Sequence, residues 1–87
     1  MENKFGSFKI KSAVLLNRVE DVMAVMSQVA VTRCEHFFNE EAFYYVAYSE
    51  HFRTIKYGDK LPEYRVLINK DGSGKITVRF QEIENGN

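Results

Sequence analysis

Residues 42–48 read Ala-Phe-Tyr-Tyr-Val-Ala-Tyr, a run rich in aromatic side chains. Aromatic and β-branched residues favour strands because they pack well on a pleated surface. Alternate side chains of a strand point to opposite faces of the sheet, so this stretch is predicted to be a strand that is apolar on both faces. One face carries the even-numbered set and the other the odd-numbered set: Tyr44, Val46 and Tyr48 against Phe43, Tyr45 and Ala47.

Two further stretches towards the C-terminus alternate between apolar and polar residues, at 64–68 and 76–80. Between them lies a loop that contains Asp71-Gly72 and Ser73-Gly74, pairs that tolerate the positive φ angles of connecting turns. The pattern predicts a β-hairpin. The polar face of this hairpin is expected to be solvated, and it carries Arg65, Lys75, Thr77 and Arg79.

The N-terminal part predicts one strand followed by one helix. Phe8 and Ile10 alternate with polar residues, as in a half-buried strand. Asn17 followed by Glu20 resembles a capping box and is the favoured start of the helix, with Ser12 as an earlier alternative. The apolar stripe of this helix has spacings of four and three residues: Leu15, Val19, Val22, Met26 and Val29.

The remaining segments complete a single α+β domain over residues 1–87. Residues 29–38 are rich in β-branched and aromatic side chains and predict a strand, whereas residues 50–62 are irregular and charged. The element order β-α-β-β-β-β is expected to form a largely antiparallel sheet with the one amphipathic helix packed on one face. Frayed ends are expected at 1–3 and 84–87.

A single helix can cover only one face of the two-sided strand at 42–48. The odd-numbered set runs on into Ser49 and His51, so we expect this set to face outward, on the side of the basic hairpin positions. Phe43 and Tyr45 would then be exposed or covered by a partner. The alternative is internal cover by the 50–62 segment, with Phe52 and Ile55 folded back over these rings.

Composition favours a protein of the reducing cytoplasm. The 87 residues carry 12 basic and 12 acidic side chains, so nothing in the net charge demands an anionic partner. The single Cys34 cannot form an internal disulfide, which excludes a disulfide-stapled secreted scaffold. No apolar run approaches the roughly 18 residues of a membrane span, and the N-terminal residues do not resemble a secretory signal.

Two patterns bear on chemistry. The loop that starts at Asn69 resembles the beginning of an EF-hand calcium loop, but its twelfth position is Phe80 instead of the bidentate glutamate, and strands flank it. Cys34 and His36 share a strand face, and His51 could approach them, yet three residues fall short of a tetrahedral zinc shell. We therefore predict no enzyme activity, no cofactor and no metal.

The sequence predicts a non-enzymatic protein-binding module, homodimeric, that acts through the aromatic uncovered face or an exposed edge of its sheet. We expect it to be of the accessory or inhibitor type found among viral and mobile-element proteins. Phe43 and Tyr45 are the expected anchors, with Arg65 and Arg79 at the rim, because aromatics and arginine dominate interface energetics. The alternative is a single-stranded nucleic-acid or nucleotide-binding face, in which stacking rings combine with cations. Those cations would be Lys9, Lys11, Arg65, Lys75 and Arg79.

Overall fold

A computed structural model describes residues 3–84, which form one five-stranded sheet and two helices. The strands are β1 (Phe5–Lys11), β2 (Ala30–Phe37), β3 (Ala42–Tyr48), β4 (Glu63–Lys70) and β5 (Ile76–Glu82). The helices α1 (Ser12–Asn17) and α2 (Val19–Met26) connect β1 to β2, and the 3-10 turn Phe38–Glu40 connects β2 to β3. The predicted α+β class is confirmed. The expected frayed residues 1–2 and 85–87 lie outside the described part.

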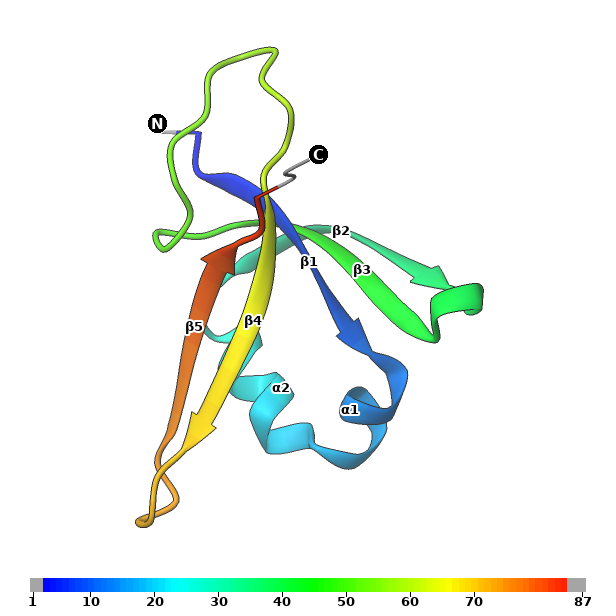
Figure 1. Cartoon of the computed structure of the whole chain (residues 1–87), viewed down its shortest axis with the longest axis vertical. Helices are drawn as coiled ribbons and strands as arrows, with labels where there is room; N and C mark the ends of the chain where they lie inside the picture. The colour runs from blue at the N-terminus through cyan, green and yellow to red at the C-terminus, as the bar shows by residue number, and fades with distance from the viewer. Residues whose placement is uncertain (1–2, 85–87) are drawn as a thin grey trace.

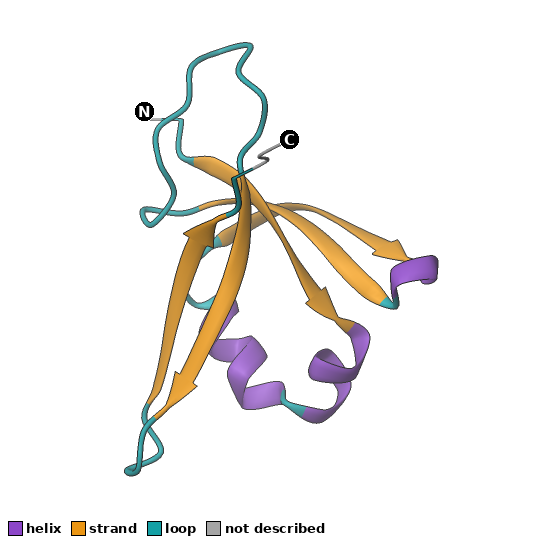
Figure 2. Cartoon of the chain, in the orientation of Figure 1, coloured by secondary structure: helices purple, strands orange, loops and turns teal. Residues whose placement is uncertain are grey.

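The strand order is β2-β3-β1-β4-β5, and neighbouring strands are antiparallel except β1 and β4. The parallel pairing is short, with Ser7 opposite Glu63 and Phe8 opposite Tyr64. Beyond these pairs the two strands diverge, so the sheet opens into one wing of β2, β3 and β1 and another of β4 and β5 (Figure 1). Both helices lie in the angle between the wings (Figure 2). We call this side the inner face and the opposite side the outer face.

The predicted single helix is wrong in detail, because the helical segment is broken at Arg18. This residue has φ −130° and ψ 57°, outside the helical region, and Asn17 ends α1 instead of capping α2. The N-cap of α2 is Arg18, without a side-chain hydrogen bond. The alternative start at Ser12 coincides with the first residue of α1. The break interrupts the expected apolar stripe, and Val19 is 56% exposed.

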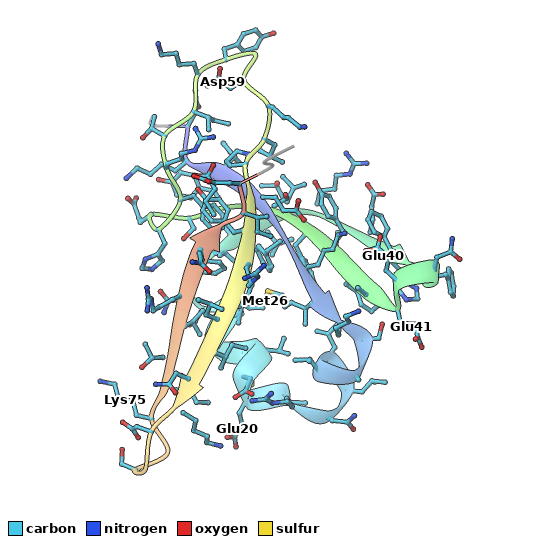
Figure 3. The ribbon with its side chains drawn as sticks, in the orientation of Figure 1. Glu20, Met26, Glu40, Glu41, Asp59 and Lys75 are labelled. Carbon is cyan, nitrogen blue, oxygen red and sulfur yellow. The ribbon has the colours of Figure 1, made fainter. Side chains whose placement is uncertain are left out.

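The core lies on the inner face, between the wings and the helices. Phe8 and Val25 are fully buried, and the Phe8 ring stacks on Tyr45 with centroids 5.2 Å apart. Met26 projects from α2 into the space between the wings (Figure 3). The apolar sides of both predicted C-terminal strands face this core, so the hairpin prediction is confirmed.

The 49–62 segment closes the end of the core that lies away from the helices (Figure 1). Phe52 is buried, stacks on Tyr64 at 4.3 Å and meets Phe80 edge-on at 5.1 Å. Phe52 therefore fixes this segment to the core at Tyr64 and Phe80, while the rings stacked on Tyr45 and Phe43 are those of Phe8 and His36. Neither described helix combines the length and the apolar character needed to cross a membrane.

Candidate binding surface

Phe43 and Tyr45, the expected partner anchors, lie on the inner face. Tyr45 is 8% exposed beneath the Phe8 ring, and Phe43 is half-buried with the His36 ring stacked on it at 4.4 Å. The prediction that the odd-numbered side chains of this strand face outward is therefore wrong. The cause is strand register, because β1 pairs its buried Phe8 with Tyr45 and its buried Ile10 with Phe43.

Arg65 and Arg79 lie on the outer face, as the alternation of the hairpin predicts. Both are exposed, and neither forms an ion pair with another residue between 3 and 84. In the hairpin register Arg65 is opposite Gln81, and Arg79 is opposite Leu67. The expected rim residues Arg65 and Arg79 thus lie on the outer face, whereas the expected anchors Phe43 and Tyr45 lie on the inner face.

Neither described helix covers the outer face of the other wing (Figure 2), and apolar side chains cluster on this face. Phe37 of β2 stacks on Tyr44 of β3 at 5.4 Å, and Phe5 of β1 meets Tyr48 of β3 edge-on at 5.7 Å. Every member of the cluster is half-buried and keeps part of its surface in water. We call this cluster the outer aromatic face: Phe5, Phe37, Tyr44, Val46 and Tyr48.

Ion pairs surround the outer aromatic face. Lys9 Nζ lies 2.8 Å from Glu40 Oε1 and 5.7 Å from the centroid of the Phe37 ring. Glu40 stands at the turn after β2 (Figure 3), and its hydrogen bond raises the pKa of Lys9. At the other end, Lys4 Nζ lies 3.3 Å from Glu50 Oε2. Lys4 and Lys9, two cations next to these rings, are thus already neutralised by carboxylates.

Tyr48 ties the rings to this charged border. Its hydroxyl donates to Glu50 Oε1 over 2.9 Å. This bond, with the one from Lys4, lowers the pKa of the Glu50 carboxyl. The Glu50 carboxylate therefore holds one ring and one cation together at the edge of the outer aromatic face.

Cys34, His36 and His51 do not form one cluster. Cys34 and His36 share the inner side of β2, where the His36 ring lies 4.4 Å from both Phe38 and Phe43. His51 Nε2 instead lies 2.6 Å from Gln28 Oε1. Among residues 3–84 no group of three or more His, Cys, Asp or Glu side chains is placed to hold a metal ion.

The loop between β4 and β5 is a hairpin turn organised by Asp71. Its Oδ1 accepts hydrogen bonds from the Ser73 amide and hydroxyl and from the Lys75 amide, over 2.9, 2.6 and 2.9 Å. These bonds lower the pKa of the Asp71 carboxyl. The carboxylate that resembles a calcium ligand is thus part of the turn, and strands, not helices, flank it.

Three hollows in the described surface, of about 190, 340 and 440 Å³, are lined without any cysteine or histidine. The smallest is apolar, lies between α2 and the strands β1 and β4, and has Lys9 and Lys11 in its lining. It is smaller than the roughly 300 Å³ at which small-molecule pockets begin, and the two larger hollows are lined mostly by polar and charged side chains, whereas such pockets are mostly apolar. None of the three therefore combines the size and the apolar lining of a small-molecule pocket.

The sequence interpretation missed the outer aromatic face because it placed Tyr44, Val46 and Tyr48 on the wrong side. Side-chain type alone does not separate the two sets, because each contains a tyrosine. The small Ala47 fits a crowded interior, where it is fully buried opposite Gly6, but the pairing of β3 with β1 decides which face is buried.

Comparison of the chain with protein-family models, curated proteins and solved structures found no match. Its function is therefore argued from its own geometry. The described residues offer an aromatic sheet face bordered by ion pairs and, on the outer face of the second wing, two exposed arginines.

Proposed function

We propose that this chain is a non-enzymatic, homodimeric protein-binding module of the cytoplasm, of an accessory or inhibitor type, that binds another protein through the outer aromatic face. The observation that carries this proposal is the set of five half-exposed apolar side chains on a sheet face that neither described helix covers. If a partner buries about 200 Å² of apolar surface on this face, the burial contributes roughly 5 kcal/mol to the free energy of association, at about 25 cal/mol per Å². Association costs are subtracted from this gain.

The charges around the rings favour a protein over a nucleic acid. A single-stranded nucleic acid needs cations that are free to neutralise phosphates beside the stacking rings. Here Lys4 and Lys9 are paired with Glu50 and Glu40, and Arg33 on the same face is paired with Glu35. The phosphates of a bound strand would have to displace these glutamates, which makes nucleic-acid binding the second candidate.

The partner surface expected to fit is apolar in the middle and acidic at one side. The apolar part would cover Tyr44 and Tyr48, which supply large amphipathic rings of the kind that anchors interfaces. The acidic part would reach Arg65 and Arg79, whose guanidinium groups have no ion-pair partner among the described residues. Arginine pairs with carboxylates through a planar fork of donors.

The proposal is tested by affinity capture from the organism that encodes the protein, with variants as baits. Tyr44→Ser/Tyr48→Ser should lose a protein that the wild type retains, while Tyr57→Ser, at a fully exposed tyrosine on the 49–62 segment, should retain it. Circular dichroism confirms that each bait is folded. Arg65→Glu/Arg79→Glu, which changes only exposed side chains, should weaken the same capture.

A titration with single-stranded oligonucleotides at two salt concentrations addresses the second candidate. Oligonucleotide binding that weakens steeply with salt and is lost in Tyr44→Ser/Tyr48→Ser would replace the protein-binding proposal. A capture profile identical for wild type and both double variants would also overturn it.

A further inference from the structure

β2 is an edge strand, and no other strand of residues 3–84 pairs with its second edge, which we call the free edge. It stands first in the sheet order, is bonded to β3 on one side, and most of its eight residues are exposed. A free edge presents unpaired amide and carbonyl groups that can template a further strand. Exposed apolar side chains flank this edge, Val31 at 43% and Phe38 at 81%.

The hydrogen-bond phase of the sheet shows which backbone groups face the free edge. The backbone amide of Ser49 donates to the Lys4 carbonyl over 3.0 Å, and the amide of Ser12 donates to the Glu41 carbonyl over 2.8 Å. Both bonds continue the register in which β1 pairs with β3. In an antiparallel ladder the bonded pairs alternate, so the even-numbered residues of β3 bond to β2. Their opposite residues in β2 are Arg33 and Glu35. Cys34 and His36 therefore direct their N–H and C=O groups to the free edge.

A β-bulge limits the regular part of this edge. The register shifts between Val31 and Arg33, and the Thr32 hydroxyl donates to the Val46 carbonyl over 3.1 Å. Bulges twist an edge and blunt its pairing. The straight portion accordingly runs from Arg33 to Phe37, a short segment on which few registers are possible.

We infer that two copies of this chain dimerise by antiparallel pairing of their β2 edges about a two-fold axis at Cys34. In this register Arg33 lies opposite the partner's Glu35, and Glu35 lies opposite the partner's Arg33. Cys34, which carries no formal charge in its thiol form, faces its own copy. Both charged residues lie on the outer face, so each edge offers the other one cation and one anion.

The other symmetric registers are disfavoured by charge. Directly opposed residues must share a face, so a symmetric pairing is centred on a residue of the straight segment. Centring on Arg33 or on Glu35 places like charges directly opposite each other, which is destabilising. Two further registers are disfavoured by the end of the strand: centring on His36 places Cys34 opposite Phe38, and centring on Phe37 places Glu35 opposite Asn39, both in the 3-10 turn. The Cys34 register alone places the two opposite charges face to face.

This inference rests on the homodimer in the proposed function and gives that dimer an interface. Joining the two β2 edges makes one continuous ten-stranded sheet. The outer aromatic faces of the two copies then lie on the same side of that sheet, because β2 supplies Phe37 to this face. The dimer would thus present one extended surface, and a partner could bind both halves at once.

The test uses charge reversal and mixing. Arg33→Glu makes positions 33 and 35 both acidic, and Glu35→Arg makes them both basic. Each variant alone should therefore have a dimer dissociation constant at least tenfold higher than that of the wild type. Sedimentation velocity measures it. An equimolar mixture of the two should restore dimers to near the wild-type level, because each acidic edge meets a basic one. Loss of the ion pair within one chain cannot produce this rescue, since an exposed pair contributes little and is not restored by mixing.

Cys34 provides an independent readout of the register. Opposed residues of a bonded antiparallel pair have Cα atoms about 5.5 Å apart, within the roughly 4.4–6.8 Å that a disulfide spans. Treatment with diamide, which accepts two electrons and two protons from two thiols as the S–S bond forms, should yield a covalent dimer. Cys34→Ser should yield none, and the mixture of the two charge variants should yield more than either variant alone.

Three results would overturn the inference: a wild-type chain that is monomeric at about 100 μM, charge variants that dimerise like wild type, or a mixture without rescue. The outcome is separable from that of the proposed function. Capture that depends on Tyr44 and Tyr48 can persist in the Arg33→Glu variant, and dimers can form without any captured protein.

Discussion

Gly6 shows how one residue sets the spacing of the core. It lies in β1 opposite Ala47, beneath the stacked rings of Tyr64 and Phe52. A Cβ at this position would lie 2.5 Å from Tyr64 Cε2 and 3.1 Å from the Phe52 ring. The Tyr64 ring cannot easily retreat, because it is stacked on Phe52 and its hydroxyl accepts a hydrogen bond from the Arg53 amide over 2.9 Å.

We predict that Gly6→Ala destabilises the protein by about 1–3 kcal/mol through overpacking. Gly72→Ala is the matched control, since a Cβ there meets nothing within 4 Å, and it should change stability by no more than about 0.5 kcal/mol. Urea unfolding followed by circular dichroism measures both. Equal midpoints for Gly6→Ala and the wild type would show that the two rings move aside without cost.

β3 is the element whose position decides which surface is available to a partner. Its aromatic content makes it a strand, but both of its faces are apolar, so its own composition does not show which one is buried. Pairing with β1 decides this, because Phe8 and Ile10 already face the core and their opposite residues, Tyr45 and Phe43, must join them. Burial raises the pKa of the Tyr45 hydroxyl, and the neighbouring Cys34 adds to the rise.

Tyr45→Ala should therefore lower the free energy of unfolding by about 3 kcal/mol or more, because it removes a buried ring that is stacked on Phe8. Tyr44→Ala, one residue away on the outer face, should cost roughly 1 kcal/mol, because its ring is half-exposed. Equilibrium unfolding in urea compares the two variants. A larger loss for Tyr44→Ala would mean that the strand presents the opposite face to the core.

The whole molecule is held together where its two wings meet. β1 and β4 pair over only two residue pairs, beside which the Ser7 amide donates to the Pro62 carbonyl over 2.9 Å. The closing 49–62 segment joins the wings because it is attached to both. The Ser49 hydroxyl donates to the Gln28 carbonyl, just before β2, over 2.8 Å, and the Phe52 ring contacts Tyr64 and Phe80 of the β4–β5 wing.

Phe52→Ala should lower the free energy of unfolding by about 3–5 kcal/mol, the usual cost of removing a buried aromatic ring. Tyr57→Ala, on the same segment but fully exposed, should leave stability within about 0.5 kcal/mol of the wild type. Thermal and urea unfolding measure the difference. Similar values for the two variants would show that the segment does not close the core.

Much of the fold can be predicted from local pattern. The hairpin at β4 and β5, the strand at β2 and the strand at β3 follow from alternation and from residue type, which are properties of the chain itself. The exposed Arg65 and Arg79 follow from the same alternation. The break at Arg18 does not, because an uninterrupted apolar stripe and a broken one have the same local spacing.

The sequence by itself determined the strands, the presence of a helical segment and the α+β class, because pleating and helical periodicity act between neighbours along the chain. Only the tertiary structure decided that Tyr45 is buried and that Tyr44 and Tyr48 face water. That choice depends on the register between β1 and β3, which are joined through both helices and β2. A shift of one residue in this register would exchange the two faces, and no local signal fixes it.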